Sequence, residues 1–430
     1  MCKIVVIGGG WAGVAAAIRG KKCGAEVVIV EKTDLLLGLG NVGGIMRNNG
    51  RFTAAEENMA MGADELFEIT DRLSTHKNVD FPGHKHASFY DVALVEPEVR
   101  RLLQGLGVEI KFMTRITDVE KDSSNRITAV MTAQGKKICG DVFVEATGST
   151  GPMGNCTRYG NGCSMCVLRC PAFGPRVSIT ERAGLEDVAA MKEDGTLGAF
   201  SGSCKLEKRS LSKKIQKKLE KDGFAVIPLP DKMINREKLG KKVCRQYALD
   251  EYAENIILID TGHAKLMTSY FNLEDLRSIE GFENARFVDP YAGGKANSVR
   301  YMSVGLREEN MKARGVENLF LGGEKSGFFI GHTEAITTGS LAGFNAAMMA
   351  MGKPLLTITP NLAVGELLDF AQRVLWEEGG LDRRFTFAGG EFFQRMKEKE
   401  LYTTDVKKIR KRVAEAGLDN VYNRQESVIK

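Results

Sequence analysis

The chain begins with a strand, a glycine-rich turn and a helix in immediate succession. Lys3–Ile7 reads KIVVI, an uninterrupted apolar run of the kind that is buried on both faces of a parallel sheet. Gly8, Gly10 and Gly13 follow in G-x-G-x-x-G spacing, and the small apolar residues after them predict a helix. This order of elements predicts an α/β fold, a doubly wound Rossmann-like sheet that binds a dinucleotide.

Each part of the turn has a distinct task. Gly8 permits the tight turn, Gly10 leaves room for a pyrophosphate, and Gly13 lets the helix pack closely on the strand. The helix N-terminus offers free N–H groups and the positive end of its dipole to the phosphates. A second apolar strand, Ala25–Val30, ends at an acid that is expected to accept hydrogen bonds from an adenosine ribose. The residues predicted to contact the dinucleotide here are Gly8, Gly10, Trp11, Ala12, Gly13, Glu31 and Lys32.

Three later segments extend this pattern. Residues 35–44 read LLLGLGNVGG, a second loop with a backbone open to close approach. Asp141–Gly148 reads DVFVEATG, a buried strand that ends in small residues. Asn318–Gly323 reads NLFLGG, another buried strand, and Thr333–Met351 after it predicts a helix.

The C-terminal part of this pattern resembles a known group of flavoproteins. The stretch from Ile279 to Leu355, which includes VENLFLGGEKSGFFIGHTEAITTGSLAGFNAAMMAMGKPLL, is similar to the FAD segment of the GidA-type tRNA-modifying flavoproteins and of the folate- and FAD-dependent tRNA uridine methyltransferases. The resemblance implies FAD as the cofactor. It also implies that FAD contacts the second loop, the two strand ends and the closing turn: Gly38, Asn41, Gly43, Gly44, Ala146, Thr147, Gly148, Gly322, Gly323, Glu324, Gly331 and Glu334.

Two residues of the closing turn are candidate catalytic groups. A helix that starts at Thr333 would direct its N–H groups at the pyrimidine edge of the flavin, where reduction places negative charge. His332 or Lys325 would then tune the flavin or donate a proton. One departure concerns the second loop. Those families carry a cysteine five residues before the Gly-Gly pair, and Gly38 stands there in this chain. This departure weighs against methylene transfer from folate through that residue.

Four cysteines are clustered soon after the strand end at Gly148. Cys156, Cys163, Cys166 and Cys170 fall within 15 residues, and their C-x₂-C-x₃-C-P end resembles iron–sulfur ferredoxin patterns, although the first gap is six residues. Four soft thiolates in a glycine-rich segment predict a [4Fe-4S] cluster. A structural zinc site, a redox disulfide between Cys163 and Cys166, and unreactive buried thiols stay open as alternatives.

These observations predict a domain organisation. We expect a discontinuous FAD-binding domain of the two-dinucleotide-binding type at 1–150 and 286–355, and an inserted α+β domain at 151–285. The insert should hold the cluster loop, a small sheet that includes Asn255–Ile259 and a basic amphipathic helix within Lys205–Lys221. We expect residues 356–430 to form a helical C-terminal tail.

The favoured function is an FAD-dependent oxidoreductase that passes electrons between flavin and cluster to a small-molecule or protein partner. One alternative is an FAD- and folate-dependent enzyme that modifies uridine in tRNA or rRNA, and another is a non-catalytic redox sensor or complex subunit. The net charge of +5 is too small to demand a nucleic-acid partner, so RNA is possible but not favoured. The sequence has no run of 18 apolar residues and enters a strand at once, so we expect no membrane span and a cytoplasmic location. A homo-oligomer stays open.

Overall fold

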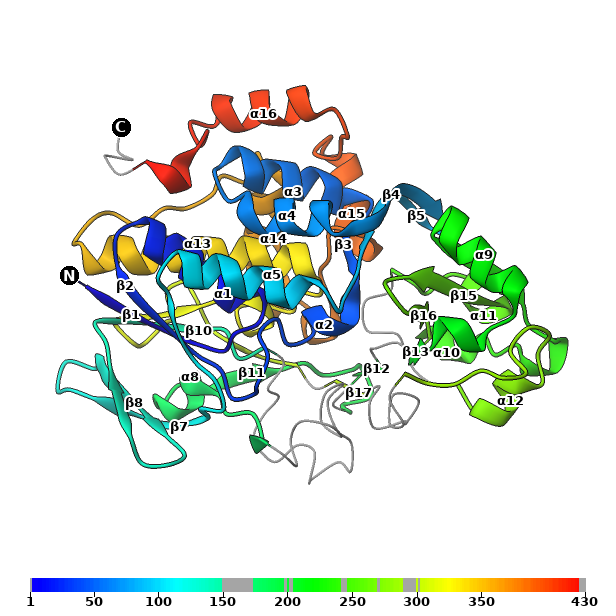
Figure 1. The fold of residues 1–430 in the computed structure, drawn as a ribbon. Coiled ribbons are helices and arrows are strands. Elements are labelled where there is room, and N and C mark those ends of the chain that lie inside the picture. The colour runs from blue at the N-terminus through cyan, green and yellow to red at the C-terminus, as the bar shows by residue number, and fades with distance from the viewer. Residues whose placement is uncertain are drawn as a thin grey trace.

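The computed structural model describes residues 2–148, 173–196, 199–200, 204–240, 246–268, 271–288, 299–300 and 302–424. Its central sheet has five parallel strands in the order β19-β10-β1-β2-β6 (Figure 1). These are β1 (Lys3–Ile7), β2 (Glu26–Val30), β6 (Glu109–Lys111), β10 (Val142–Glu145) and β19 (Leu319–Leu321). The edge strand β19 comes from the distant C-terminal segment, which confirms a discontinuous α/β fold.

Both faces of this sheet are covered, which explains why its strands read as unbroken apolar runs. Ile4 and Val6 face the layer of helices, whereas Val5 and Ile7 face the opposite side. The helical layer contains α1 (Trp11–Lys22), α5 (Val95–Gly105) and α13 (His332–Ala350). The opposite layer is an antiparallel sheet of β7 (Ile116–Lys121), β8 (Ile127–Thr132) and β9 (Lys137–Cys139), with α8 (Ile179–Arg182) beside it.

Helices α1 and α13 pack against each other through small residues. A Cβ at Gly339 would lie 2.1 Å from the carbonyl oxygen of Ala12, and a Cβ at Gly343 would lie 2.2 Å from that of Ala16. The two glycines are one helical turn apart on α13, as are the two alanines on α1. The small-residue character of the segment after Thr333 therefore serves close helix packing next to the glycine-rich turn.

The inserted region forms the small sheet that the sequence predicts. Its strand order is β13-β16-β15-β14, all antiparallel: β13 (Cys204–Leu206), β14 (Phe224–Pro228), β15 (Asn255–Asp260) and β16 (Ala264–Leu266). Helices α9 (Lys213–Asp222) and α12 (Leu273–Arg277) share a core with one face of it. The other face packs against the sheet of β3 (Ile45–Arg47), β5 (His84–Tyr90) and β4 (Ser74–Phe81). The insert and the N-terminal segment therefore share a hydrophobic core.

The C-terminal tail is helical, as predicted, and it packs onto the body of the molecule. It contains α14 (Ala363–Arg373), α15 (Gly390–Glu398) and α16 (Val406–Glu415), and α16 lies above α3 (Gly50–Ala60) at the top of Figure 1. The other α-helices among the described residues are α2 (Gly40–Gly43), α4 (Glu65–Arg72), α10 (Glu237–Gly240) and α11 (Glu251–Glu254). Short strand pairs join β11 (Asp187–Ala189) to β18 (Ser303–Gly305) and β12 (Ala199–Phe200) to β17 (Val299–Arg300). In the described ranges, no helix is both long enough and apolar enough to cross a bilayer.

Candidate cofactor site

The glycine-rich turn after β1 has the geometry that its spacing predicts. Gly8 has φ of +101°, and a Cβ there would lie 2.4 Å from the carbonyl oxygen of Ala146 at the end of β10. A Cβ at Gly13 would lie 1.8 Å from the carbonyl oxygen of Gly8, so the helix touches the turn directly. At Gly10, the N-cap of α1, no atom beyond its chain neighbours lies within 4 Å of the Cβ position. Gly8 and Gly13 are thus required by close backbone contacts within the protein. Gly10 leaves open space at a helix N-terminus, which we call the cradle.

Glu31 lies at this turn, immediately after β2. One carboxylate oxygen accepts the Gly9 N–H at 2.8 Å, and the other accepts the backbone N–H and hydroxyl of Thr33 at 2.8 and 2.9 Å. The carboxylate is buried and held in one orientation beside the cradle. The ammonium of Lys32 donates to the carbonyl oxygen of Gly174 at 2.8 Å, so it ties the end of β2 to the residues that precede α8.

The second glycine loop is the point where three parts of the molecule meet. Tyr90 donates its hydroxyl proton to the Gly40 carbonyl oxygen at 2.8 Å. Lys205 and Lys265, which are directly opposed on strands β13 and β16, donate to the carbonyl oxygens of Asn41 and Gly43. Cations are favourable at these carbonyls because they form the C-terminal end of the short helix α2. The insert is therefore bonded to the loop that the sequence assigns to the flavin.

His332 stands beside the same loop, at the first position of α13. A Cβ at Gly43 would overlap the imidazole, lying 1.6 Å from its Nε2 atom, so only glycine fits there. The imidazole also forms a triangle with Trp11 and Tyr90, in which ring centroids lie 5.9 to 6.2 Å apart. The candidate catalytic histidine and the predicted loop are therefore brought together. Gly38, by contrast, has open space around its Cβ position and φ of +48°.

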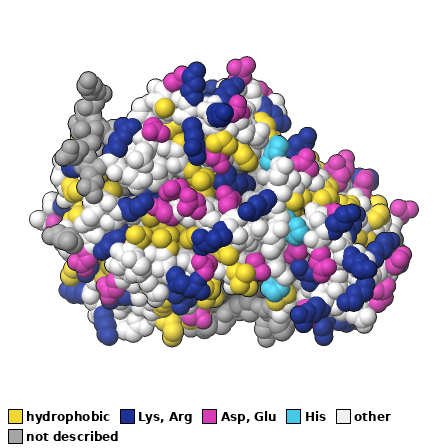
Figure 2. Space-filling model, turned by 45° about the horizontal axis from the view of Figure 1, so that its top comes forward, with side chains coloured by type: hydrophobic (Ala, Val, Ile, Leu, Met, Phe, Trp, Pro, Cys, Tyr) yellow, Lys and Arg dark blue, Asp and Glu magenta, His cyan; other side chains and the backbone are white. Residues whose placement is uncertain are grey.

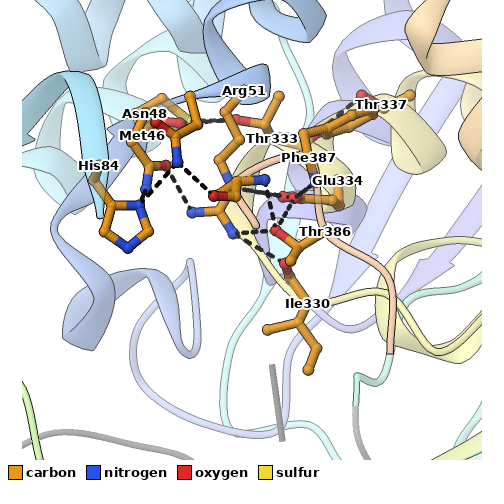
Figure 3. Close-up of polar contacts among 12 residues, drawn as sticks. Met46, Asn48, Arg51, His84, Ile330, Thr333, Glu334, Thr337, Thr386 and Phe387 are labelled. Carbon is orange, nitrogen blue, oxygen red and sulfur yellow. Dashed lines mark hydrogen bonds and ion pairs between the residues drawn. The ribbon is translucent and has the colours of Figure 1, made fainter. Parts of the chain in front are cut away.

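Glu334 points toward Arg51 and Thr386 (Figure 3). Both of its oxygens lie 3.1 Å from Nε of Arg51, and Oε1 also accepts the Thr386 hydroxyl at 2.7 Å and the Phe387 N–H at 2.9 Å. The side chain is fully buried. Its partners are thus protein groups, and its effect on a cofactor would pass through the position of the α13 N-terminus.

Arg51 is a residue that the sequence interpretation missed. Besides Glu334, its guanidinium donates to the carbonyl oxygen of Ile330, the Thr386 hydroxyl and the side chain of Asn48 (Figure 3). Asn48 in turn bonds Nδ1 of His84 at 2.9 Å, and burial lowers the pKa of His84 to about 3. No local pattern signals this network, because Arg51 and Glu334 are 283 positions apart.

Lys325, the other catalytic candidate, is fully buried in an ion-pair cluster. Its ammonium contacts the Asp187 carboxylate and lies 2.9 Å from the Ser178 hydroxyl and 4.0 Å from Glu145. Burial raises the pKa of Glu145, which accepts the N–H groups of Ile179 and Thr180 at 2.8 Å each. The cluster joins the carboxyl ends of β10 and β19 to α8, so Lys325 has partners that suit a structural role.

The other predicted contacts gather at the same edge of the sheet. Ala146, Thr147 and Gly148 follow β10 beside Gly8, and Thr147 donates its hydroxyl proton to Glu145 at 2.9 Å. Gly322, Gly323 and Glu324 follow β19, where the Gly323 N–H bonds the Thr338 hydroxyl at 2.8 Å. Gly331 precedes α13 with φ of +142°.

The cysteines of the predicted cluster, Cys156, Cys163, Cys166 and Cys170, lie outside the described residues. Within the described ranges, no three His, Cys, Asp or Glu side chains are placed to hold a metal ion.

Comparison with known proteins decides the family. A family model described as glucose inhibited division protein A matches residues 3–269 and 260–354. The chain belongs to this family. Two crystal forms of Aquifex aeolicus GidA have the same fold, with TM-scores of 0.63 and 0.60 and 16% and 15% sequence identity. They cover 96% of this chain, which covers 76% and 78% of theirs. A search of the curated proteins finds no match.

Membership of the GidA family makes this chain an FAD-dependent enzyme. The described residues fit FAD, because the open cradle at Gly10 lies at the N-terminus of α1, with Glu31 beside it. Gly8–Gly13 would hold the pyrophosphate, and the loop at 38–44 with His332 would lie along the flavin. When bound, FAD supplies hydride or two-electron chemistry. The protein groups named here would hold FAD at the N-terminus of α1.

Proposed function

We propose that this FAD-dependent enzyme modifies a uridine base in tRNA or rRNA. The observation that carries the proposal is the extent of the family match, which runs through both pieces of the FAD sheet and through the inserted sheet. The segment from Ile279 to Leu355 resembles the same group of uridine-modifying flavoproteins. The fold shared with Aquifex aeolicus GidA is consistent with the proposal.

The residues of the site limit the reaction that is proposed. His332 lies beside Gly43 at the first position of α13, and in this proposal it acts on the flavin as a proton donor or an electrostatic group. Gly38 supplies no thiol, so the proposal includes no transfer of a one-carbon unit through a covalent bond to that residue. It is limited to a flavin-dependent redox step on the base or on a group delivered to it.

The proposal is tested with FAD-loaded protein and unmodified RNA transcripts. After incubation with a reductant and a one-carbon donor, the RNA is digested and its nucleosides are compared by mass spectrometry. We expect a mass change confined to uridine, which His332→Ala reduces strongly. The control is Gly10→Val protein, in which FAD binding and therefore the modification should be weakened. Unchanged nucleosides with every donor, although RNA binds, would contradict uridine modification.

We also propose a second function, electron transfer between the flavin and a cysteine-ligated cluster to a partner. A specific observation favours it. The described residues on either side of 149–172 lie near the glycine-rich turn: Ala146 and Thr147 contact the Cβ position of Gly8, and the carbonyl oxygen of Gly174 bonds Lys32. The described residues that flank the cysteine-bearing segment thus lie at the carboxyl edge of the FAD sheet. These two flanking ends support the proposal, whereas Cys156, Cys163, Cys166 and Cys170 themselves lie outside the described residues.

Anaerobic purification with iron and sulfide assay tests this second proposal. We expect about four irons per chain and a broad charge-transfer shoulder beneath the flavin bands. Cys163→Ser and Cys166→Ser should each lose the iron and keep FAD, because an alkoxide is a poor substitute for a soft thiolate. Stoichiometric zinc without iron would contradict the redox cluster. Metal-free protein that cycles between a Cys163–Cys166 disulfide and the dithiol would replace it with a thiol relay.

A further inference from the structure

Helix α9 presents a row of lysines to solvent. Lys213, Lys214, Lys217, Lys218 and Lys221 are exposed, whereas Glu220 and Asp222 are the two acids of the helix. In the described part of the chain no ion pair joins these lysines to a carboxylate. Lys and Arg side chains gather on the lobe at the right of Figure 2, where Figure 1 places α9.

The row is held rigidly. On the opposite side of α9, Ile215 and Leu219 are buried in the core that the helix shares with the inserted sheet. The Ser212 side chain accepts the Ile215 N–H at the N-terminus, and Gly223, with φ of +79°, ends the helix. At a rise of about 1.5 Å per residue, Lys213, Lys217 and Lys221 stand in steps of about 6 Å along one line.

The residue types on the exposed face of α9 indicate which kind of partner it binds. Its exposed positions carry no aromatic or apolar side chain. Protein–protein interfaces need an apolar centre and are depleted in lysine, whereas contact with a phosphate backbone needs only cations at intervals. We propose that the five lysines of α9 bind the phosphate backbone of the RNA substrate. This inference rests on the proposed uridine modification and adds the surface that holds the RNA.

The topology places this surface at a distance from the flavin loop. Along β15, Ile256 and Leu258 face α9, while Ile257 and Ile259 face the other side of the sheet. Lys265, which bonds Gly43, pairs directly with Ile259 and so lies on that other side. An RNA that reaches both α9 and the loop must extend on the order of 20 Å, because a sheet and a helix layer intervene. A structured stem meets this requirement and a mononucleotide does not.

The test uses the FAD-loaded full chain and a labelled stem-loop RNA with a uridine in its loop. Lys214, Lys217 and Lys218 are changed to Gln together. The matched control changes Lys407, Lys408 and Lys411 of α16, which are also exposed, and removes the same charge. Affinity is measured by fluorescence anisotropy between about 50 and 200 mM salt. We expect the α9 variant to lose about two to three units of the slope of log K against log salt, at up to about 0.9 per phosphate contact, and the α16 variant to keep the wild-type slope.

Each other outcome is decisive. If the wild type binds no RNA, the proposed function fails and this inference fails with it. If RNA binds and the α9 variant behaves as wild type, or if both variants lose the same slope, the surface on α9 is wrong while the proposed function stands. Competition by poly-glutamate as strong as by RNA of equal charge would also overturn the assignment, because it would indicate an acidic protein partner. Binding of uridine monophosphate should be unaffected by the α9 substitutions, and a matching loss there would overturn the proposed geometry.

Discussion

Single glycines in the turn after β1 have separable roles. A Cβ at Gly10 would meet no atom from other parts of the protein within 4 Å, whereas a Cβ at Gly13 would overlap the Gly8 carbonyl oxygen. We expect Gly10→Val to weaken FAD binding at least tenfold and to leave the thermal midpoint of the apoprotein near that of wild type. Gly13→Ala should instead destabilise the fold by about 1–3 kcal/mol. Fluorescence titration with FAD and urea unfolding measure the two effects. Wild-type FAD affinity in Gly10→Val would contradict the cradle.

The buried Arg51–Glu334 pair gives a second prediction for a single residue. Arg51→Met would leave Glu334 fully buried without its cation, so we expect a loss of about 3–5 kcal/mol in the free energy of unfolding. The control is Arg101→Met, which removes an exposed partner of Glu98 and should cost no more than about 1 kcal/mol. Urea unfolding measures both. A double variant, Arg51→Met with Glu334→Leu, should recover part of the loss in the free energy of unfolding. Equal losses in Arg51→Met and Arg101→Met would refute the role assigned to the buried pair.

Among the helices, the contact between α1 and α13 is unusually close. Gly343→Ala should destabilise the protein, because the added methyl group would lie 2.2 Å from the carbonyl oxygen of Ala16, although alanine is normally the better residue in a helix. The control is Gly105→Ala at the last position of α5, where no atom lies within 4 Å. We expect Gly105→Ala to be neutral or stabilising by up to about 1 kcal/mol. Thermal unfolding compares the two, and a stabilising Gly343→Ala would contradict the observed packing.

For the molecule as a whole, Glu57 joins the tail to the body. Its buried carboxylate accepts the N–H groups of Ala363 and Val364 at 3.0 Å each, at the start of α14, and lies 3.7 Å from Arg412 of α16. Burial raises the pKa of Glu57 from 4.5 to about 7. Between these two values the folded protein retains a proton that the unfolded chain has lost. The free energy of unfolding should therefore fall as the pH rises through this window, by up to about 1.4 kcal/mol per pH unit.

Glu57→Gln isolates this contribution. The variant should show a flatter dependence of the urea midpoint on pH between about 5 and 7, since glutamine does not titrate and still accepts one of the two N–H groups. The difference between wild type and variant cancels the titration of other groups. If the urea midpoints of wild type and Glu57→Gln changed with pH in parallel, the titration of Glu57 would not contribute to the pH dependence of stability.

The sequence by itself determined the local parts of this protein. Lys3–Ile7, the glycine spacing after it and the strand before Ala146 are continuous segments, and each encodes its conformation through its own hydrophobic run or through residues without a Cβ. The same patterns placed two distant segments in one FAD sheet, because a family of flavoproteins repeats them in this order. They also predicted the amphipathic helix that became α9, since a repeat of four residues is visible within one segment.

Only the tertiary structure decided how buried polar groups are paired. The sequence analysis predicted Glu334 as an FAD contact and Lys325 as a candidate catalytic group. In the structure, Glu334 forms a buried ion pair with Arg51, and Lys325 forms one with Asp187. Lys205 and Lys265 donate hydrogen bonds to the loop at Asn41 and Gly43, about 160 and 220 positions away along the chain. No periodic pattern in the sequence predicts these contacts. The physical reason is that a buried charge must find a partner wherever packing brings one, and this choice depends on the whole fold rather than on neighbouring residues.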